Sequence, residues 1–155
     1  LTAQIDVWID AASIATGDEK RDEHLKGPDF FDAANHKQIT FYSTALTVKP
    51  GNDDENEFKI WGSLTIKGIS KNIKLNVDFG GIIIDNWGKE KAGFTVTGKI
   101  NRLDWGLDWN MSLTNGGFIV SNDIGIHCEI ELTNVANTER KMKVEVQEDM
   151  VQVKK

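Results

Sequence analysis

Alternation of apolar and polar residues with period two constrains this chain more than any other feature. Residues 4–10, 58–66, 73–79, 94–100 and 124–132 each carry apolar side chains at every second position. Successive side chains of a β-strand point to opposite faces, so each stretch predicts a strand with one wet and one dry face. Antiparallel strands of this kind either stack as two sheets or curl into a barrel with an apolar interior.

A short helical segment is predicted after the first strand. Thr16 and Glu19 have the spacing of a capping box, and acidic residues are frequent in the first helical turn. A lysine followed by a glycine marks the end of the last turn. We therefore predict one or two helical turns over residues 18–32. The apolar side chains expected to pack on an end of the sheet are Leu25, Phe30 and Phe31.

Length and charge narrow the function classes. The 155 residues predict a single β-rich domain over residues 1–134, followed by a charged tail or extra hairpin over 135–155. A net charge of −6 argues against nucleic acid as a partner. No apolar run approaches the ~20 residues of a membrane-spanning helix, and no leader is recognised, so any export signal has been removed or never existed. Cys128 is the only cysteine and is expected to be a buried structural thiol.

The densest polar cluster, residues 18–24, is a candidate for metal or acid–base chemistry. Consecutive helical residues point ~100° apart, however, so Asp22, Glu23 and His24 do not converge on one ion, and a solvated, salt-bridged face is favoured. His127 falls on the wet side of its strand, which favours a surface histidine. No nucleophile elbow, phosphate loop or zinc-binding motif is present. We therefore predict neither an enzyme, nor a metal site, nor a cofactor.

Arg102 falls at a dry-face position unless its strand bends at Asn101. A buried guanidinium needs a partner. The favoured interpretation is an ion pair with Asp104 or Asp108 that locks a bend. The alternative is an anchor for an anionic head group of a ligand.

The tryptophans support a second class of function. Trp8 and Trp61 fall on the polar sides of their strands, Trp105 and Trp109 flank a turn, and the last is Trp87. Exposed tryptophans can form a sugar-stacking platform, so a β-sandwich carbohydrate-binding module is the alternative function. Stacking on neighbouring strands explains the same residues equally well.

Four motifs in order resemble the YceI-like domain of bacterial exported proteins. They are DAASIATG (10–17) leading into RDEHLK (21–26) and PDFFD (28–32); ITF (39–41) followed by GSLTIKGISK (62–71); WG (87–88) before AGF (92–94); and INRLDWGL (100–107) with WN (109–110). The resemblance spans residues 6 to about 132. It implies an all-β, antiparallel, lipocalin-like barrel with a short helical segment between strands, a long isoprenoid-type lipid in the apolar interior, and a periplasmic or secreted setting.

The leading hypothesis is therefore non-enzymatic binding, transport or sequestration of an apolar, isoprenoid-type lipid inside the barrel. Gly62 and Gly98 occupy inward positions, where a missing side chain leaves room or lets the sheet coil. Arg102 is the candidate for a polar head group. The expected cavity lining is Ile39, Phe41, Phe58, Ile60, Gly62, Leu64, Leu75, Val77, Phe79, Phe94, Val96, Gly98, Ile100, Arg102, Ile126 and Ile130.

This sequence departs from the family pattern at its front, where members usually carry some fifty more residues with the opening strands. The expected result is a free strand edge along residues 3–10, which is prone to pair with another chain. We therefore predict a homodimer, or use of residues 142–153 as a substitute strand.

Overall fold

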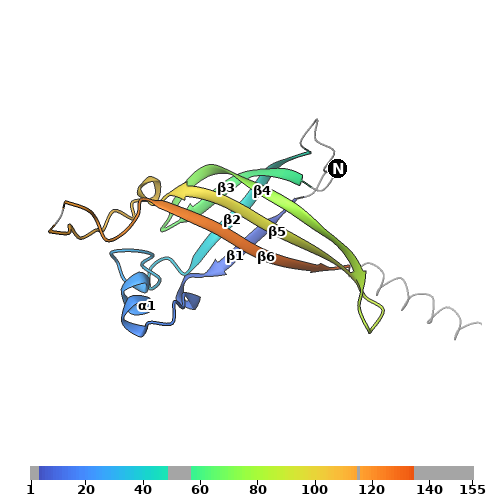
Figure 1. The fold of residues 1–155 in the computed structure, drawn as a ribbon, viewed down its shortest axis with the longest axis horizontal. Helices are drawn as coiled ribbons and strands as arrows, with labels where there is room; N and C mark the ends of the chain where they lie inside the picture. The colour runs from blue at the N-terminus through green and yellow to red at the C-terminus, as the bar shows by residue number, and fades with distance from the viewer. Residues whose placement is uncertain (1–3, 49–56, 115, 135–155) are drawn as a thin grey trace, which may run out of the picture.

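A computed structural model of the protein describes residues 4–48, 57–114 and 116–134 (Figure 1). Six strands form one antiparallel sheet in the order β1-β2-β3-β4-β5-β6, each strand pairing with the next along the chain. The elements are β1 (Asp6–Asp10), η1 (Ala11–Ser13), α1 (Glu19–Lys26), β2 (Gln38–Val48), β3 (Glu57–Ile66), β4 (Ile69–Ile84), β5 (Glu90–Asn101), η2 (Arg102–Trp105) and β6 (Asp123–Thr133).

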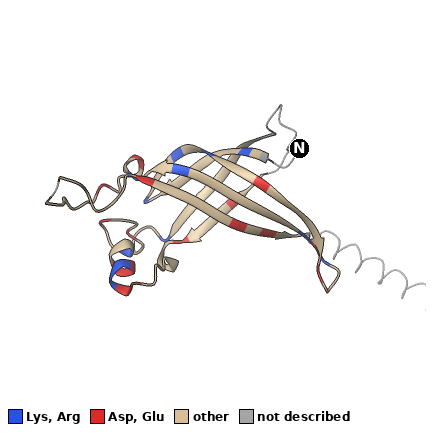
Figure 2. Cartoon of the chain, viewed as in Figure 1, with Lys and Arg blue, Asp and Glu red and all other residues tan. Residues whose placement is uncertain are grey.

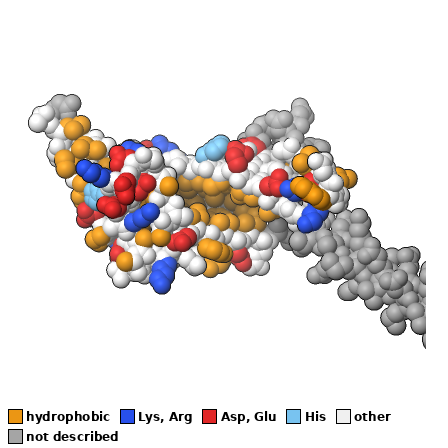
Figure 3. All heavy atoms as spheres, turned by 90° about the horizontal axis from the view of Figure 1, so that it is seen from below, with side chains coloured by type: hydrophobic (Ala, Val, Ile, Leu, Met, Phe, Trp, Pro, Cys, Tyr) orange, Lys and Arg blue, Asp and Glu red, His pale blue; other side chains and the backbone are white. Residues whose placement is uncertain are grey.

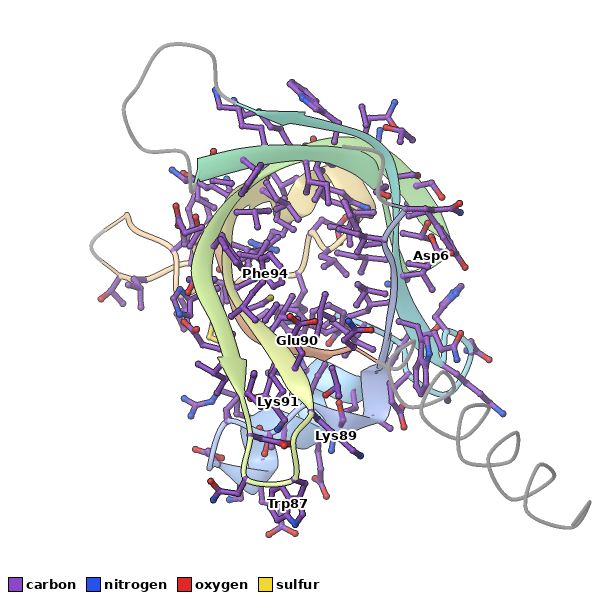
Figure 4. All side chains as sticks on the ribbon, turned by 90° about the vertical axis from the view of Figure 1, so that its right-hand side faces the viewer. Asp6, Trp87, Lys89, Glu90, Lys91 and Phe94 are labelled. Carbon is purple, nitrogen blue, oxygen red and sulfur yellow. The ribbon has the colours of Figure 1, made fainter. Side chains whose placement is uncertain are left out.

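The sheet curls on itself, so that its strands surround an apolar interior when the molecule is viewed along them (Figure 4). This confirms the all-β, antiparallel, lipocalin-like barrel. Within the described residues, β1 and β6 are the edges of the sheet and no ladder joins them, so the barrel is open along one side. Pairing of this edge with a second copy stays a prediction, and the proposed substitute strand, residues 142–153, lies outside the described residues.

Strand β4 is longer than the alternation predicts. The alternating pattern ends at Phe79, but the strand continues through Gly80 and Gly81 to Ile84, with a register shift between Phe79 and Gly81. Gly81 has a φ of 111°, a conformation that an L side chain rarely adopts, and the pair of glycines accommodates the irregularity without ending the ladder. The isoleucines after the glycines are therefore part of the sheet.

The helical segment forms where the sequence predicts it, with a different cap. Helix α1 begins after Asp18, whose carboxylate accepts a hydrogen bond from the backbone N–H of Arg21 at 3.1 Å. The Thr16–Glu19 capping box is therefore not the cap. The Thr16 hydroxyl instead donates to Asp22 Oδ1 at 2.6 Å. The helix carries both charge signs on its surface (Figure 2), as expected of a solvated face.

The core lies at one end of the barrel. Its buried members come from β2, β3, β4 and the segment that begins with η2: Phe41, Ile60, Leu64, Ile66, Leu75, Val77, Trp105 and Leu107. Phe30 is also buried, whereas Leu25 and Phe31 are half-buried. The inner faces of β5 and β6 contribute only half-buried or exposed side chains to this interior. The apolar inner face is thus buried mainly on β2, β3 and β4, and partly exposed on β5 and β6.

Candidate ligand-binding groove

The strand register brings the predicted dry positions onto one face. Residues that sit directly opposite each other in an antiparallel ladder project to the same side of the sheet. Phe79 of β4 is opposite Phe94 of β5, and Phe94 is opposite Ile130 of β6. The rings of Phe79 and Phe94 lie 5.3 Å apart between their centroids. These side chains form one continuous apolar wall across three strands.

That wall is accessible along the open side of the barrel. Figure 3 shows a hollowed band of hydrophobic side chains there, bordered by charged residues at both ends. We call this band the groove. Its members are inner-face apolar side chains that are half-buried or exposed: Val7, Ile9, Ile39, Phe58, Ile73, Phe79, Phe94, Val96, Ile100, Ile124, Ile126, Ile130 and Leu132.

The expected lining residues divide into two groups by burial. Phe41, Ile60, Gly62, Leu64, Leu75 and Val77 are buried and form the floor behind the groove. Those half-buried at its surface are Ile39, Phe58, Phe79, Phe94, Val96, Gly98, Ile100, Ile126 and Ile130. The alternation predicts the face of each residue, but burial also depends on the distance of its strand from the open side.

The two inward glycines do not leave empty space. A Cβ on Gly98 would collide with Leu75 Cδ2, and a Cβ on Gly62 would lie 2.6 Å from Phe41 Cε2 and 2.5 Å from the Tyr42 carbonyl oxygen. The neighbouring side chains already occupy the room that a missing Cβ provides. The two glycines let large side chains pack closely on the inner face, and any ligand would bind above them.

Arg102 does not face the groove. Strand β5 ends at Asn101, and Arg102 begins η2 with its side chain only 2% exposed. Its guanidinium donates hydrogen bonds to the carbonyl oxygens of Ser121 (2.9 Å), Leu107 and Trp109 (2.9 Å) and to Asn122 Oδ1 (3.3 Å).

These contacts use four of the five guanidinium N–H donors. The favoured ion pair with Asp104 or Asp108 is therefore wrong: within the described part of the chain, carbonyl oxygens take the place of those carboxylates. The assignment of Arg102 to a ligand head group is also corrected, because its donors are committed to the chain and shielded from the groove. Arg102 ties η2 to the loop that follows it.

Trp105 closes the same end of the barrel. Its side chain is 1% exposed and its indole Nε1 donates to the carbonyl oxygen of Leu64 at 3.1 Å. Gly106 follows with a φ of 67°, which turns the chain so that Leu107 also enters the core. We call Arg102, Trp105 and Leu107 the plug. The plug closes the apolar interior at this end.

Glu90 lies on the inner face next to the groove, and it is not among the site residues that the sequence predicts. It sits opposite Ile84, so its half-buried side chain is on the inner face at the end away from the plug. Figure 4 shows it within the ring of strands. Its Oε2 accepts a hydrogen bond from Asn134 Nδ2 at 2.8 Å. The signal was present, because the β5 alternation extends backwards from Phe94 through Ala92 to Glu90.

The remaining charged side chains of this region face outward. Lys91 Nζ lies 2.7 Å from Glu131 Oε1 and 4.0 Å from Asp85 Oδ2, and the hydrogen bond to Glu131 raises the pKa of Lys91. A separate depression of about 330 Å³ lies at Gly80 and Gly93. It is lined by side chains of both faces of the sheet, such as Phe94 on the inner face and Glu131 on the outer face. Two of its polar lining residues interact, since the Thr95 hydroxyl donates a hydrogen bond to Glu129 Oε2 at 3.1 Å.

The other sequence candidates do not come together as a site. Trp8 and Trp61 are exposed on the outer faces of β1 and β3, with β2 between them, and Lys74 Nζ lies 5.7 Å from the centroid of the Trp61 ring. Trp105 is buried, and Trp109 packs its ring against His24 at 4.5 Å. These placements form no common sugar-stacking surface. Among the described residues, no group of histidine, cysteine and carboxylate side chains is arranged to hold a metal.

A curled antiparallel sheet with an apolar inner face defines a barrel fold of the lipocalin type. The chain belongs to the YceI-like family: the YceI-like domain is matched over residues 1–132. A UPF0312 protein of Staphylococcus aureus (strain N315) is 34% identical over 133 residues, covering 85% of this chain and 72% of the relative.

Solved structures agree with this assignment. The chain is similar to the Campylobacter jejuni YceI protein, with a TM-score of 0.71, 34% identity, and coverage of 85% of this chain and 72% of that one. It is also similar to Burkholderia cenocepacia BcnA, with a TM-score of 0.65, 25% identity, and coverage of 83% and 73%. The family is one of binding proteins and supports lipid binding as a general function. No helix in the described residues has the length and apolar character needed to cross a membrane.

Proposed function

We propose that this protein is a non-enzymatic carrier or sequestering protein that binds an isoprenoid-type lipid in the groove. The observation that carries the proposal is the hollowed apolar inner face along the open side of the barrel (Figure 3). Burial of apolar carbon contributes about 0.8 kcal/mol per CH₂, so about ten buried groups suffice for micromolar binding. The family supports lipid as the ligand class, and a periplasmic or secreted setting is part of the same proposal.

We propose further that the ligand lies with its tail toward the plug and its polar end toward Glu90. The plug seals one end with buried side chains, whereas Glu90 offers a carboxylate at the other end. A carboxylate accepts hydrogen bonds from a hydroxyl or an amine and repels an anionic group. A prenyl alcohol therefore fits the groove better than a prenyl phosphate.

Two neighbouring residues on opposite faces of β6 provide the test. Ile126 faces the groove, and His127 is exposed on the outer face with its Nε2 2.8 Å from Glu129 Oε1. Ile126→Asn should weaken binding of dansylated farnesol by about tenfold or more, because it places a polar group against the tail. His127→Asn introduces the same residue outside the groove and should bind as the wild type does. Equal affinities in all three proteins would contradict the proposal.

The orientation of the ligand is tested separately at Glu90. Glu90→Gln removes the charge and keeps the shape of the side chain, so the preference for farnesol over farnesyl phosphate should fall by several-fold. Glu129→Gln is the matched control, because that carboxylate lies on the outer face of β6. Competition of each compound against the dansylated probe measures the preference. An unchanged preference in Glu90→Gln would remove Glu90 from the site.

A further inference from the structure

The end of β4 and the turn that follows it project beyond the barrel (Figure 1) and carry exposed large apolar side chains. Ile82, Ile83 and Ile84 are 58%, 62% and 74% exposed, and Trp87 at the tip is 82% exposed. We call residues 82–89 the hairpin tip. Large apolar side chains gathered at this level of exposure are costly in water and mark an interaction surface.

The hairpin tip is continuous with the groove. Ile82 is opposite Ala92, which is itself opposite Leu132, so these three side chains share the inner face. Ile84 is opposite Glu90 on that face and extends it toward Trp87. An apolar molecule can therefore pass between the hairpin tip and the groove along inner-face side chains, on the side away from the plug.

The turn is held in shape by its own acidic residue. Asp85 Oδ1 accepts hydrogen bonds from the backbone N–H groups of Trp87 at 2.9 Å and Lys89 at 2.8 Å. Its other oxygen faces the Lys91 ammonium group at 4.0 Å. The Asp85 carboxylate thus interacts with groups of the turn and with Lys91. Lys89 is exposed beside Trp87 (Figure 4). A preformed tip loses little conformational freedom when it binds.

We propose that the hairpin tip docks the protein on a lipid bilayer, with Trp87 in the interfacial region and the open end of the groove facing the membrane. The inference rests on the proposed function, because it supplies the route by which a lipid enters and leaves the groove. A tryptophan with neighbouring isoleucines and a flanking lysine suits the membrane–water interface. The tip is also a narrow projection, whereas a stable protein interface needs roughly 800 Å² from each partner.

A second exposed apolar loop provides the comparison. Met111, Leu113, Phe118 and Ile119 are also exposed, but their loop follows the plug, whose side chains close that end of the barrel. Docking through this loop would place the closed end against the membrane. The geometry therefore favours the hairpin tip over the loop at residues 111–119.

The test measures flotation of the full chain with vesicles of zwitterionic phosphatidylcholine. Trp87→Ser should weaken partition by about tenfold, because it removes a large apolar side chain from the bilayer interface. Trp8→Ser, on the outer face of β1, and Phe118→Ser, in the loop beyond the plug, are matched controls that should partition as the wild type does. Phosphatidylcholine with brominated chains should quench more of the wild-type tryptophan emission than that of Trp87→Phe.

Several outcomes would overturn the docking proposal. They are absence of wild-type flotation, equal flotation of Trp87→Ser and wild type, a loss in Phe118→Ser as large as that in Trp87→Ser, or equal quenching of wild type and Trp87→Phe. Binding of dansylated farnesol without vesicles is measured on the same proteins. If that binding persists while flotation is absent, docking fails and the proposed function stands. If the probe does not bind, the proposed function fails.

Discussion

The strands packed against the plug and the strand at the open side of this barrel have the same alternating pattern but differ in burial. At the plugged end, Trp105 and Leu107 fill the interior against the inner faces of β3 and β4, and Ile60 is 2% exposed. Toward the open side, the inner positions of β6 stay half-buried or exposed, as Ile126 and Leu132 do. The difference in burial comes from what packs against each strand, because all of these strands have the same alternation of apolar and polar residues.

This comparison separates stability from binding within one sheet. Side chains under the plug are packed on all sides, so their loss should leave cavities and lower the free energy of unfolding. Side chains along the groove already meet solvent, so their loss should cost less stability and more ligand affinity.

Arg102 should give the largest loss of stability. Arg102→Ala removes the donors that satisfy the carbonyl oxygens of Ser121, Leu107 and Trp109. Leaving such groups unpaired in a buried site should lower the free energy of unfolding by about 3–5 kcal/mol, measured by urea denaturation. Lys99→Ala is the control, because its ion pair with Asp123 at 2.6 Å is exposed and should contribute less than about 1 kcal/mol. Equal losses of unfolding free energy in the two variants would contradict the stabilising role of Arg102 in the plug.

Two phenylalanines of the inner face test whether stability and ligand binding depend on different parts of the barrel. Phe41 is buried on the floor, whereas Phe94 is half-buried in the groove. Phe41→Ala should cost about 3–5 kcal/mol of unfolding free energy, and Phe94→Ala about half of that. The order should reverse for dansylated farnesol, with Phe94→Ala showing the larger loss of affinity. The same ranking of the two variants in both assays would show that the floor and the groove do not differ in role.

Gly98 tests how closely the floor is packed. Because Leu75 occupies the space above this glycine, Gly98→Leu should force that side chain aside and lower the free energy of unfolding by about 1–3 kcal/mol. Gly125 is opposite Lys99 on the outer face, and a Cβ there would meet no atom within 4 Å. Gly125→Leu should therefore cost less. A Gly98→Leu protein as stable as the wild type would mean that Leu75 moves freely.

The smallest expected effect concerns pH and α1, outside both the plug and the groove. A hydrogen bond from the Thr16 hydroxyl lowers the pKa of Asp22 below its ordinary value of 3.8. A carboxyl whose pKa is lowered by folding stabilises the protein above that ordinary value, and the contribution disappears as pH falls through the lowered value. In Thr16→Val the Asp22 pKa should move up toward 3.8, as followed by NMR of the carboxyl carbon. An unchanged pKa would show that the Thr16 hydroxyl has no effect on it.

The sequence was a good guide wherever burial follows from alternation. The patterns at residues 58–66, 73–79 and 94–100 predict strands whose apolar faces do form the inner wall. Extending the last pattern backwards would also have identified Glu90. The family resemblance likewise predicted the barrel that the structure shows.

The sequence was a poor guide where a local irregularity changes the outcome. Two glycines after Phe79 suggest the end of a strand, but in the structure they form a bulge. The alternating pattern over residues 73–79 therefore does not predict that residues 82–84 belong to the sheet. Arg102 follows the alternation by position, yet the Asn101 side chain accepts a hydrogen bond from Leu103 N–H and begins η2. Three of the four partners of Arg102 named above are backbone carbonyl oxygens, and no residue pattern reveals these.

The central claim is that the groove, and not the outer face, binds the ligand. Methyl NMR of the isoleucines during a farnesol titration tests it most directly, because inner and outer isoleucines are present on the same sheet. We expect the methyl signals of Ile100, Ile126 and Ile130 to shift together and saturate. The signal of Ile83, which is opposite Lys91 on the outer face, should stay unchanged. Shifts confined to Ile83, or no saturable shift at any groove methyl, would contradict the account.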